Sequence, residues 1–475
     1  MTDSSLAPVV RASGLAGTVG RPYLFQLAWP VAIGLMIAVL LAPALWNGFP
    51  FIFADTGGYL ARPFLRELAL GRSALYGLFL ALGIPFDFWP VVLVQAVVTA
   101  WIVILTLRAH GVGGRPGLAL AVIAALALLT SLPWYVGQLM PDFFVPLAVL
   151  GIYLLAFRAK KLRRMERVGV CAVLAFAMTS HMSIFALALG LLIVFAVMRW
   201  LAGWLGTARP GMSLPAIAVA AGALLALLSN LVIAGAFAFT PGGSTFLFGR
   251  MVQSGIVDRY LSENCPDPSL RLCAYRDQIP RMADDWLWWG QSPLHKLGGW
   301  EAFEPEARRI IAESLLRYPV MHLESAITAT LTQLVTLQTG EGINPENNWH
   351  AEWMLRELAP NSMPQYRAAA QQQDLFDFTA INIVQVPIAF LSTVGLVVIF
   401  VVFRKRRRHK AALAFTVAMA LLGNAAICGI FSNPNARYQS RIMPAAVLTV
   451  IIAGLAAQPR RMPFPVRRLS AARES

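Results

Sequence analysis

The chain contains long apolar stretches in which no Lys, Arg, Asp or Glu occurs. Several of them run for about 16 to 26 residues, the length that a helix needs to cross the hydrocarbon core of a bilayer. Of the 475 residues, 57% are apolar and only 13% are charged, and the mean hydropathy is +0.62. Soluble domains carry about twice this share of charged residues. A soluble multi-domain enzyme is therefore excluded, and an integral membrane protein is indicated.

The apolar stretches predict an all-α integral membrane protein with about ten transmembrane helices and one large, partly helical periplasmic segment. The fourth to sixth stretches are short for a crossing, so their limits are the least well defined. Residues 75–86 fit an interfacial or half-buried piece. The expected spans are 25–46, 88–107, 116–132, 141–157, 168–180, 182–198, 214–239, 379–403, 411–431 and 442–457.

Lys and Arg are concentrated in alternate short loops next to the expected spans. If both termini are cytoplasmic, the cytoplasmic segments hold more than half of the 39 basic residues, including the runs at 158–167 and 404–410. The same segments hold only the acids Asp3, Glu166 and Glu474. This is the positive-inside pattern, and it predicts a multi-pass protein of a bacterial inner membrane with both termini in the cytoplasm. The net charge of +15 then reflects topology and contact with anionic membrane lipids, and nucleic-acid binding is not expected.

The long segment 240–378 has the opposite charge balance, with more acids than basic residues. We expect it to be periplasmic and to separate an N-terminal transmembrane region, 1–239, from a C-terminal transmembrane region with a basic tail, 379–475. Within the segment, residues 304–319 have the apolar spacing of a helix, with acids at the start and a proline at the end. We expect this helix to lie against the membrane.

Two parts of the outer segment are rich in aromatic residues. The tryptophans of DDWLWWG (284–290) and Trp300 fit either anchors at headgroup depth or a packed core of the segment. The turn-rich stretch QTGEGINPENNWHAEW (338–353) suits recognition of a hydroxylated substrate. It equally fits a surface loop without a function.

The cysteines agree with this placement. Cys265 and Cys273 lie in the outer segment within ENCPDPSLRLC, and their spacing predicts a disulfide in an oxidising compartment, with two free thiols as the alternative. Cys171 and Cys428 lie inside expected spans and are interpreted as small buried hydrophobic residues. No spacing of Cys and His indicates a zinc site.

Charged and polar residues that interrupt the apolar sequence lie almost entirely at the outer ends of the expected spans. Charges at this depth are costly unless they are paired or used, so they form a functional hypothesis. The group consists of Asp55 in FADTGGYL, Asp142 in MPDFF, His181 in TSHMS, and Arg437 and Arg441 in NPNARYQSRIMP.

Each of these residues also has a structural interpretation. Asp55 and Asp142 both fit helix N-caps, where a carboxylate accepts backbone N–H groups. His181 fits an interfacial histidine, and Arg437 and Arg441 fit side chains that extend to the outer headgroups. Arginines on the outer face nevertheless oppose the positive-inside trend, and this favours a bound anion.

The motifs FADTGGYL, MPDFF and ARYQSRIMP, with a long outer segment between them, resemble the polytopic type C glycosyltransferases. The resemblance covers the architecture of most of the chain and identifies no subfamily. It implies a sugar donor carried on a polyprenyl phosphate or diphosphate, and transfer to a glycan or lipid acceptor at the periplasmic face. In that family the acid of the first outer loop acts as base or associates with a metal, and late arginines hold the lipid phosphate.

The chemistry of glycosyl transfer assigns the same roles from the residue types. A carboxylate must take the proton of the acceptor hydroxyl, and cations must stabilise the departing phosphate. We expect Asp55 as the base, and Asp142 as a second catalytic acid that orients the acceptor or shares a metal. The expected substrate-binding residues are His181, Arg250 in TPGGSTFLFGR, Arg437, Tyr438 and Arg441.

The cofactor and the function class keep alternatives open. Asp55 is followed by Thr56 and Gly57 and not by a second acid two positions on, so the choice between no cofactor and a divalent metal is left open. A transporter or flippase of lipid-linked glycans is the main alternative from another class, although midplane polar residues and repeats are few. A surface-polysaccharide polymerase or ligase and a structural membrane subunit are the others.

Overall fold

The computed structural model describes residues 28–205, 208–346 and 348–455. Within this part of the chain the regular structure is helical, without a β-strand, and eight helices are long and apolar enough to cross a membrane. The prediction of an all-α integral membrane protein is therefore confirmed.

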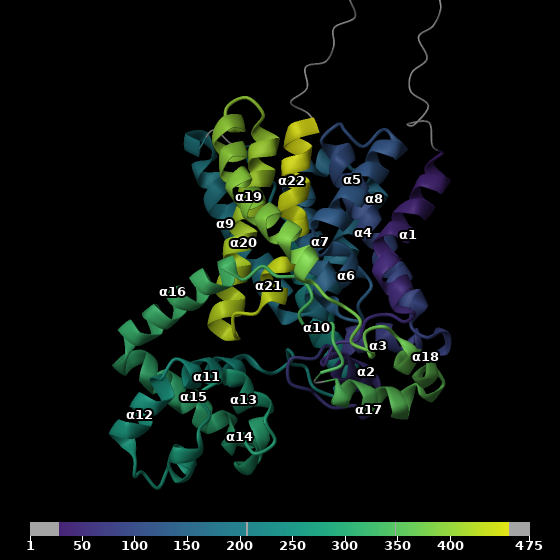
Figure 1. Ribbon diagram of the computed structural model, residues 1–475. Coiled ribbons are helices and arrows are strands. Elements are labelled where there is room, and N and C mark those ends of the chain that lie inside the picture. Colours follow the sequence, from purple (N-terminus) through teal and green to yellow (C-terminus); the bar gives the residue numbers. More distant parts are fainter. Residues whose placement is uncertain (1–27, 206–207, 347, 456–475) are drawn as a thin grey trace, which may run out of the picture.

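The helices of the membrane bundle stand side by side in Figure 1, and each of the expected spans corresponds to one of them. α7 lies in the middle and is buried at every position, because it is apolar on all sides. α19 forms part of the outer layer, and Val394, Val397 and Val401 on it are exposed as lipid contact requires. The bundle consists of α1 (Trp29–Asn47), α4 (Trp89–Ala109), α5 (Pro116–Leu129), α7 (Phe144–Tyr153), α8 (Arg164–Ser180), α9 (Met182–Leu205), α10 (Ser213–Ala234), α19 (Thr379–Phe403), α20 (Arg408–Phe431) and α22 (Met443–Leu455).

The structure corrects the limits of the short spans. The fourth continues through 3-10 and π-helical turns, so that Pro141–Lys161 is helical throughout, and the sixth extends to Leu205. The fifth, α8, begins at Arg164 and not at 168. Charged residues end an apolar stretch without ending a helix, and this is why the predicted spans were too short. Of the ten helices, α5 and α8 are too short to count among the eight long apolar helices.

Residues 243–317 form a separate lobe with its own hydrophobic core, built around Phe248, Trp286 and Phe303. The prediction of a helix at 304–319 is confirmed by α15, which packs into the lobe through Phe303 and Ile310. Its contact with the membrane stays a prediction. The lobe consists of α11 (Gly243–Gln253), α12 (Ile256–Asn264), η6 (Arg271–Gln278), α13 (Ala283–Trp288), α14 (Pro293–Lys296) and α15 (Gly299–Arg317).

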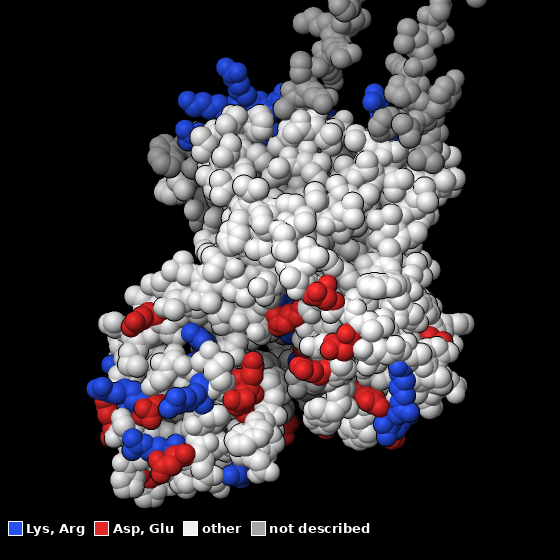
Figure 2. All heavy atoms as spheres, in the orientation of Figure 1, with Lys and Arg blue, Asp and Glu red and all other residues white. Residues whose placement is uncertain are grey.

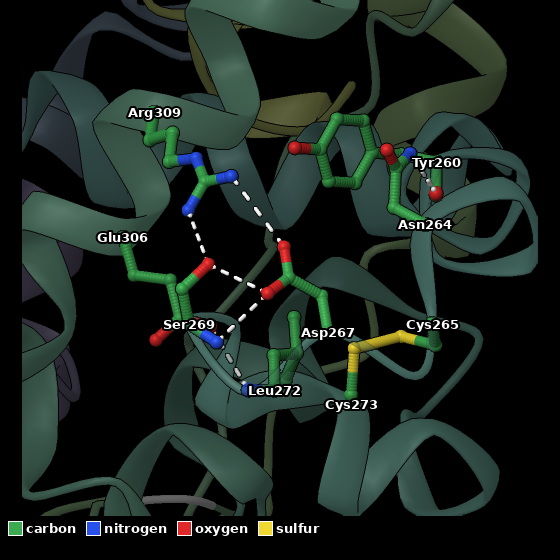
Figure 3. Close-up of a disulfide and its surroundings, with 9 residues drawn as sticks. All are labelled: Tyr260, Asn264, Cys265, Asp267, Ser269, Leu272, Cys273, Glu306 and Arg309. Atoms are coloured by element: carbon green, nitrogen blue, oxygen red, sulfur yellow. Dashed lines mark hydrogen bonds and ion pairs between the residues drawn. A yellow bond between two sulfur atoms is a disulfide. The ribbon is translucent and has the colours of Figure 1, made fainter.

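The predicted disulfide between Cys265 and Cys273 is present in the lobe, with a Cα–Cα distance of 5.6 Å (Figure 3). The loop that it closes is tied to α15 by side chains. The backbone N–H of Leu272 donates to Glu306 Oε1 at 2.9 Å, and Arg309 pairs with Asp267 at 3.6 Å. The covalent link and these contacts together hold the loop on the lobe.

The rest of segment 240–378 does not belong to the lobe. Ala351 and Leu355 of α17 (Trp349–Leu358) share the hydrophobic core of the bundle, and α17 packs on α2 (Thr56–Leu65). Segment 240–378 is therefore divided between two bodies, whereas the sequence predicted a single region. We call the second body the α2–α17 layer. It consists of α2, α3 (Ala74–Ala81), η2 (Ile84–Phe86), α17, η7 (Pro360–Ser362) and α18 (Met363–Ala368).

α16 (Pro319–Val335) connects the lobe to the bundle and packs along the end of α20 (Figure 1). A Cβ atom on Gly429 would lie 2.7 Å from the carbonyl oxygen of Ala329, so the absence of a side chain allows the two helices to touch. The side chain of Gln333 exchanges two hydrogen bonds with the backbone of Asn435, at 2.8 and 2.9 Å. α16 thereby fixes the segment that leads into the short helix α21 (Ala436–Ser440). The Tyr135 hydroxyl of another short helix, α6 (Leu132–Val136), hydrogen-bonds to Arg437 O and Ser440 Oγ of α21.

The two ends of the bundle differ in charge. In Figure 2 the acidic side chains in view lie at the end that carries the lobe, where they are mixed with Lys and Arg, whereas at the opposite end Lys and Arg are seen without acids. α1 begins and α22 ends at that opposite, basic end (Figure 1). The residues before 28 and after 455, which include the expected cytoplasmic tails, lie outside the described residues.

This arrangement sharpens the topology prediction. Because the basic end is expected inside, a periplasm-dependent phosphatase fused after residue 300, in the lobe, should be active, whereas one fused in the 404–410 loop should be inactive. The measurement is phosphatase activity per amount of fusion protein in intact cells. Activity at 404–410 and none at 300 would invert the topology.

Candidate active site

The carboxylate of Asp55 lies at the lobe-side end of the bundle between two arginines from distant parts of the chain. Arg72 Nη2 is 2.5 Å from Asp55 Oδ1, and Arg437 Nη2 is 3.4 Å from Asp55 Oδ2. The Asp55 side chain is 21% exposed, so it is held but still reachable from solvent. It makes no capping hydrogen bond to α2, and the helix-cap interpretation is therefore wrong.

The loop that carries Asp55 is held by backbone and side-chain hydrogen bonds. Phe51 exchanges backbone hydrogen bonds with Gly137 and Leu139, both at 2.9 Å. Gln371, which is buried, accepts from the N–H of Ile52 at 3.0 Å and donates to its carbonyl oxygen at 2.6 Å. These contacts connect the first outer loop to the segment before Asp142 and to the end of the α2–α17 layer.

The glycines of FADTGGYL have separate steric roles. A Cβ on Gly57 would lie 2.7 Å from the Cα of Ala351, so Gly57 allows α17 to approach the start of α2. A Cβ on Gly58 would lie 3.2 Å from Nε of Arg72, so Gly58 leaves room for the guanidinium that binds Asp55. Gly57 and Gly58 of the motif therefore allow α17 and Arg72 to pack close to Asp55.

Arg437 is buried beside Asp55 and is enclosed by aromatic rings. Its guanidinium carbon lies 4.1 Å from the ring centroid of Phe53 and 4.9 Å from that of Tyr438. Its backbone N–H donates to Glu341 Oε2 at 2.8 Å, and its Nε is buried without a hydrogen-bond partner. A guanidinium that is packed in this way keeps a fixed direction, as bidentate recognition of phosphate requires.

Asp142 and Arg441 form a second ion pair that is closed to solvent. Arg441 Nη1 is 2.8 Å from Asp142 Oδ1, and the two side chains are 0% and 2% exposed. Oδ2 of Asp142 has no hydrogen-bond partner, and the carboxylate makes no capping bond, so the helix-cap interpretation is wrong for Asp142 as well. Arg437 and Arg441 are both buried and paired with acids, and this contradicts their interpretation as side chains that extend to headgroups.

Tyr438 and His181 connect the two ion pairs to their surroundings. The Tyr438 ring lies between the guanidinium groups, 4.9 Å from that of Arg437 and 5.0 Å from that of Arg441. His181 Nδ1 accepts from the backbone N–H of Ser183 at 3.2 Å, and Ser183 Oγ accepts from Arg441 Nη2 at 3.3 Å. A chain of hydrogen bonds through Ser183 and Arg441 thus links His181 to Asp142.

Arg250 is the one expected site residue that the structure places apart from the others. It lies on α11 in the lobe, its Nε is buried without a partner, and burial lowers the pKa of its guanidinium. Among the described residues no hydrogen bond or ion pair joins Arg250 to Asp55 or to either late arginine. α11 packs on α13 and α15 of the lobe and also contacts α20 of the bundle.

Several residues near Asp55 were missed by sequence reasoning. Arg72 and Glu341 contact the site directly, and Asp284 of α13 accepts from Asn433 Nδ2 at 3.2 Å. Desolvation and the negative charges of Asp285 and Asp55 raise the pKa of Asp284. Arg72 could have been found by the criterion that selected Arg437 and Arg441, because it too is a basic residue in a loop expected on the outer face.

The two carboxylates expected at a metal are both paired with arginine. Both oxygens of Asp55 face guanidinium groups, and Asp142 is paired with Arg441. In the part of the chain that the structure describes, no three His, Cys, Asp or Glu side chains are grouped to hold an ion. Carboxylates that are occupied by arginine offer few free oxygens to a hard cation.

The comparisons with known proteins returned no relative. No protein-family model, curated protein or solved structure matches the chain. The interpretation of the site therefore depends on its geometry and chemistry.

Proposed function

We propose that the protein is a glycosyltransferase of a bacterial inner membrane that uses a polyprenyl-phosphate-linked or polyprenyl-diphosphate-linked sugar at the periplasmic face. The observation that carries the proposal is the partly exposed Asp55 carboxylate between Arg72 and Arg437, at the end of the bundle where a lipid headgroup would lie. A base and a phosphate-binding cation at adjoining positions are what glycosyl transfer needs.

The chemistry follows from these two groups. Asp55 takes the proton of an acceptor hydroxyl, whose oxygen attacks the anomeric carbon of the donor sugar. The bond from that carbon to the phosphate oxygen breaks, and its electron pair leaves with the polyprenyl phosphate or diphosphate. Arg437 and Arg72 stabilise the added negative charge on the leaving group. The phosphate competes with Asp55 for both arginines, so donor binding also frees the carboxylate to accept a proton.

Asp142 and Arg441 have a supporting role in this proposal. Both are closed to solvent and neutralise each other, so neither is placed to touch a substrate. Arg441, which Asp142 holds, packs on the Tyr438 ring, and Arg437 packs on the same ring. Asp142 and Arg441 are therefore positioning residues, and Arg437 is the arginine that we assign to the donor phosphate.

The decisive experiment uses the purified protein in lipid nanodiscs with a radiolabelled polyprenyl-phosphate sugar and a membrane extract as the source of acceptor. The proposal expects free polyprenyl phosphate to appear together with label in a new product. A transporter or flippase would move the donor and leave the bond between sugar and phosphate intact. An intact donor with every sugar tested would reject the proposal.

Arg437 offers a sharper test within the same assay. Arg437→Ala should lower kcat/KM for the donor by about 100-fold or more, because a buried cation that faces the leaving group is lost. Arg437→Lys should recover only part of the rate, since a point charge cannot reproduce the planar fork. Arg356→Ala, which removes an exposed arginine of α17, is the matched control and should leave the rate unchanged. Equal rates for wild type and Arg437→Ala would remove Arg437 from the site.

A further inference from the structure

The surface around Asp55 carries large aromatic side chains that are left exposed. Trp288 on α13 is 51% exposed, and on α17 Trp349 is 73% and Trp353 is 51% exposed. Of the two interpretations of DDWLWWG, the packed core of the segment holds for Trp286, which is buried in the lobe core. It does not hold for Trp288 and Trp289, which remain outside that core. We call the exposed tryptophans, together with the half-buried His350 between two of them, the aromatic rim. It consists of Trp288, Trp289, Trp349, His350 and Trp353.

The rings on α17 form one continuous surface. Trp349 and Trp353 are four residues apart, which places them on the same face of the helix. His350 bridges them, with ring centroids 5.6 Å from Trp349 and 6.1 Å from Trp353. The opposite face of α17, with Ala351 and Leu355, packs into the layer formed with α2.

This surface points away from the membrane bundle. α2 lies between α17 and the bundle in Figure 1, so the face of α17 opposite to α2 looks into the aqueous side. Tryptophans that anchor a protein in headgroups lie at the level of the membrane interface. α17 lies beyond the lobe-side end of the spanning helix α1 in Figure 1, so its exposed tryptophans are not on a spanning helix.

The aromatic rim flanks the carboxylate on two sides. Arg72, which binds Asp55, has its guanidinium carbon 5.8 Å from the ring centroid of Trp288. On the other side, a Cβ on Gly57 would lie 2.9 Å from the carbonyl oxygen of His350, so α17 touches the start of α2 two residues after Asp55. Burial and the charge of Arg72 lower the pKa of His350, while Asp55 acts in the opposite direction, which agrees with this proximity.

The ligand that suits such a surface has apolar faces and polar edges. A sugar ring presents C–H groups on its faces and hydroxyl groups around its edge. Tryptophan offers a large rigid apolar face at low entropic cost, and a few polar groups beside it set the orientation of a ligand. Here the polar groups are the Asp55 carboxylate, the Arg72 guanidinium and the imidazole of His350.

We propose that the acceptor is a saccharide, which lies across Asp55 between Trp288 and the rings of α17. The role as acceptor rests on the proposed transferase function, whereas the binding of saccharide does not. The sequence left the acceptor open between a glycan and a lipid. We choose the glycan, because the rim faces away from the bundle. The hydroxyl to be glycosylated then meets Asp55 while the neighbouring sugars stack on the tryptophans.

Saccharide binding is measurable without a donor. The probe is a set of soluble oligosaccharides of glucose, galactose, mannose and N-acetylglucosamine, added to the full-length protein in nanodiscs. Saturation-transfer NMR should show contact with the ring protons of at least one of them. The double variant Trp349→Ala/Trp353→Ala should raise the Kd for that oligosaccharide by at least about fivefold. The pair Trp349→Phe/Trp353→Phe should restore most of the affinity, and Trp200→Ala, which removes an 82% exposed tryptophan of α9, should change nothing.

The outcomes separate this inference from the proposed function. If none of the oligosaccharides binds, or the double alanine variant binds like wild type, the saccharide surface is refuted even when the protein transfers sugar. If saccharide binds through the tryptophans but no polyprenyl phosphate is ever released, the surface stands and the transferase function is refuted. An Asp55→Asn protein that still binds saccharide but does not transfer sugar supports both.

Discussion

Asp55→Asn is expected to reduce sugar transfer by about 10²- to 10⁴-fold while the protein stays folded. Asparagine keeps the size of the side chain but cannot accept the proton of the acceptor hydroxyl. It also removes the charge that holds Arg72 and Arg437 at 2.5 and 3.4 Å. The measurements are the initial rate with saturating donor and acceptor, and the thermal midpoint in one detergent.

Asp277→Asn is the matched control, because Asp277 is an exposed acid of the lobe and the same change there should alter neither quantity. The Asp55 variant should lose rate through kcat more than through KM for the donor, since the arginines that hold the phosphate remain. A fully active Asp55→Asn protein would show that its ion pairs are structural. Asp284, which is influenced by the charge of Asp55 and has a raised pKa, would then be the carboxylate to test.

The second large effect concerns stability. Asp142→Ala should lower the free energy of unfolding by about 3 to 5 kcal/mol, because it leaves the Arg441 guanidinium buried without its counter-ion. The double replacement Asp142→Leu/Arg441→Met should recover most of this loss, since it removes both charges together. The measurement is the loss of folded protein in detergent with rising denaturant or temperature.

An exposed ion pair supplies the comparison. Glu352→Ala breaks the contacts of Glu352 with Arg356 and Arg367 on the surface of α17 and should cost less than about 1 kcal/mol. If Asp142→Ala were no worse than Glu352→Ala, the pair with Arg441 would not support the fold. The activity of the double variant shows whether Asp142 is structural or catalytic. If Asp142 is catalytic, the double variant will be stable but inactive.

Local patterns in the sequence predicted the helices of the bundle and the disulfide. A membrane span must be apolar along its length whatever it packs against, so α19 and α20 were found close to their true limits. The ends of the fourth and fifth spans were misjudged because helical turns extend to Lys161 and α8 begins at Arg164, both within the charged stretch 158–167. The acids and arginines at the outer ends were also visible, since a charge next to a span is unusual wherever it occurs.

Which of those charges meet was decided by the tertiary structure alone. Asp55 and Asp142 look alike in the sequence, yet one is 21% exposed between two arginines and the other is 2% exposed and closed by one. Their partners Arg437 and Arg441 lie 382 and 299 positions away, in α21 and at its C-terminal end, in the other half of the chain. Exposure and pairing depend on how the helices cross, and the energy of that packing is spread over many weak contacts that no short motif contains.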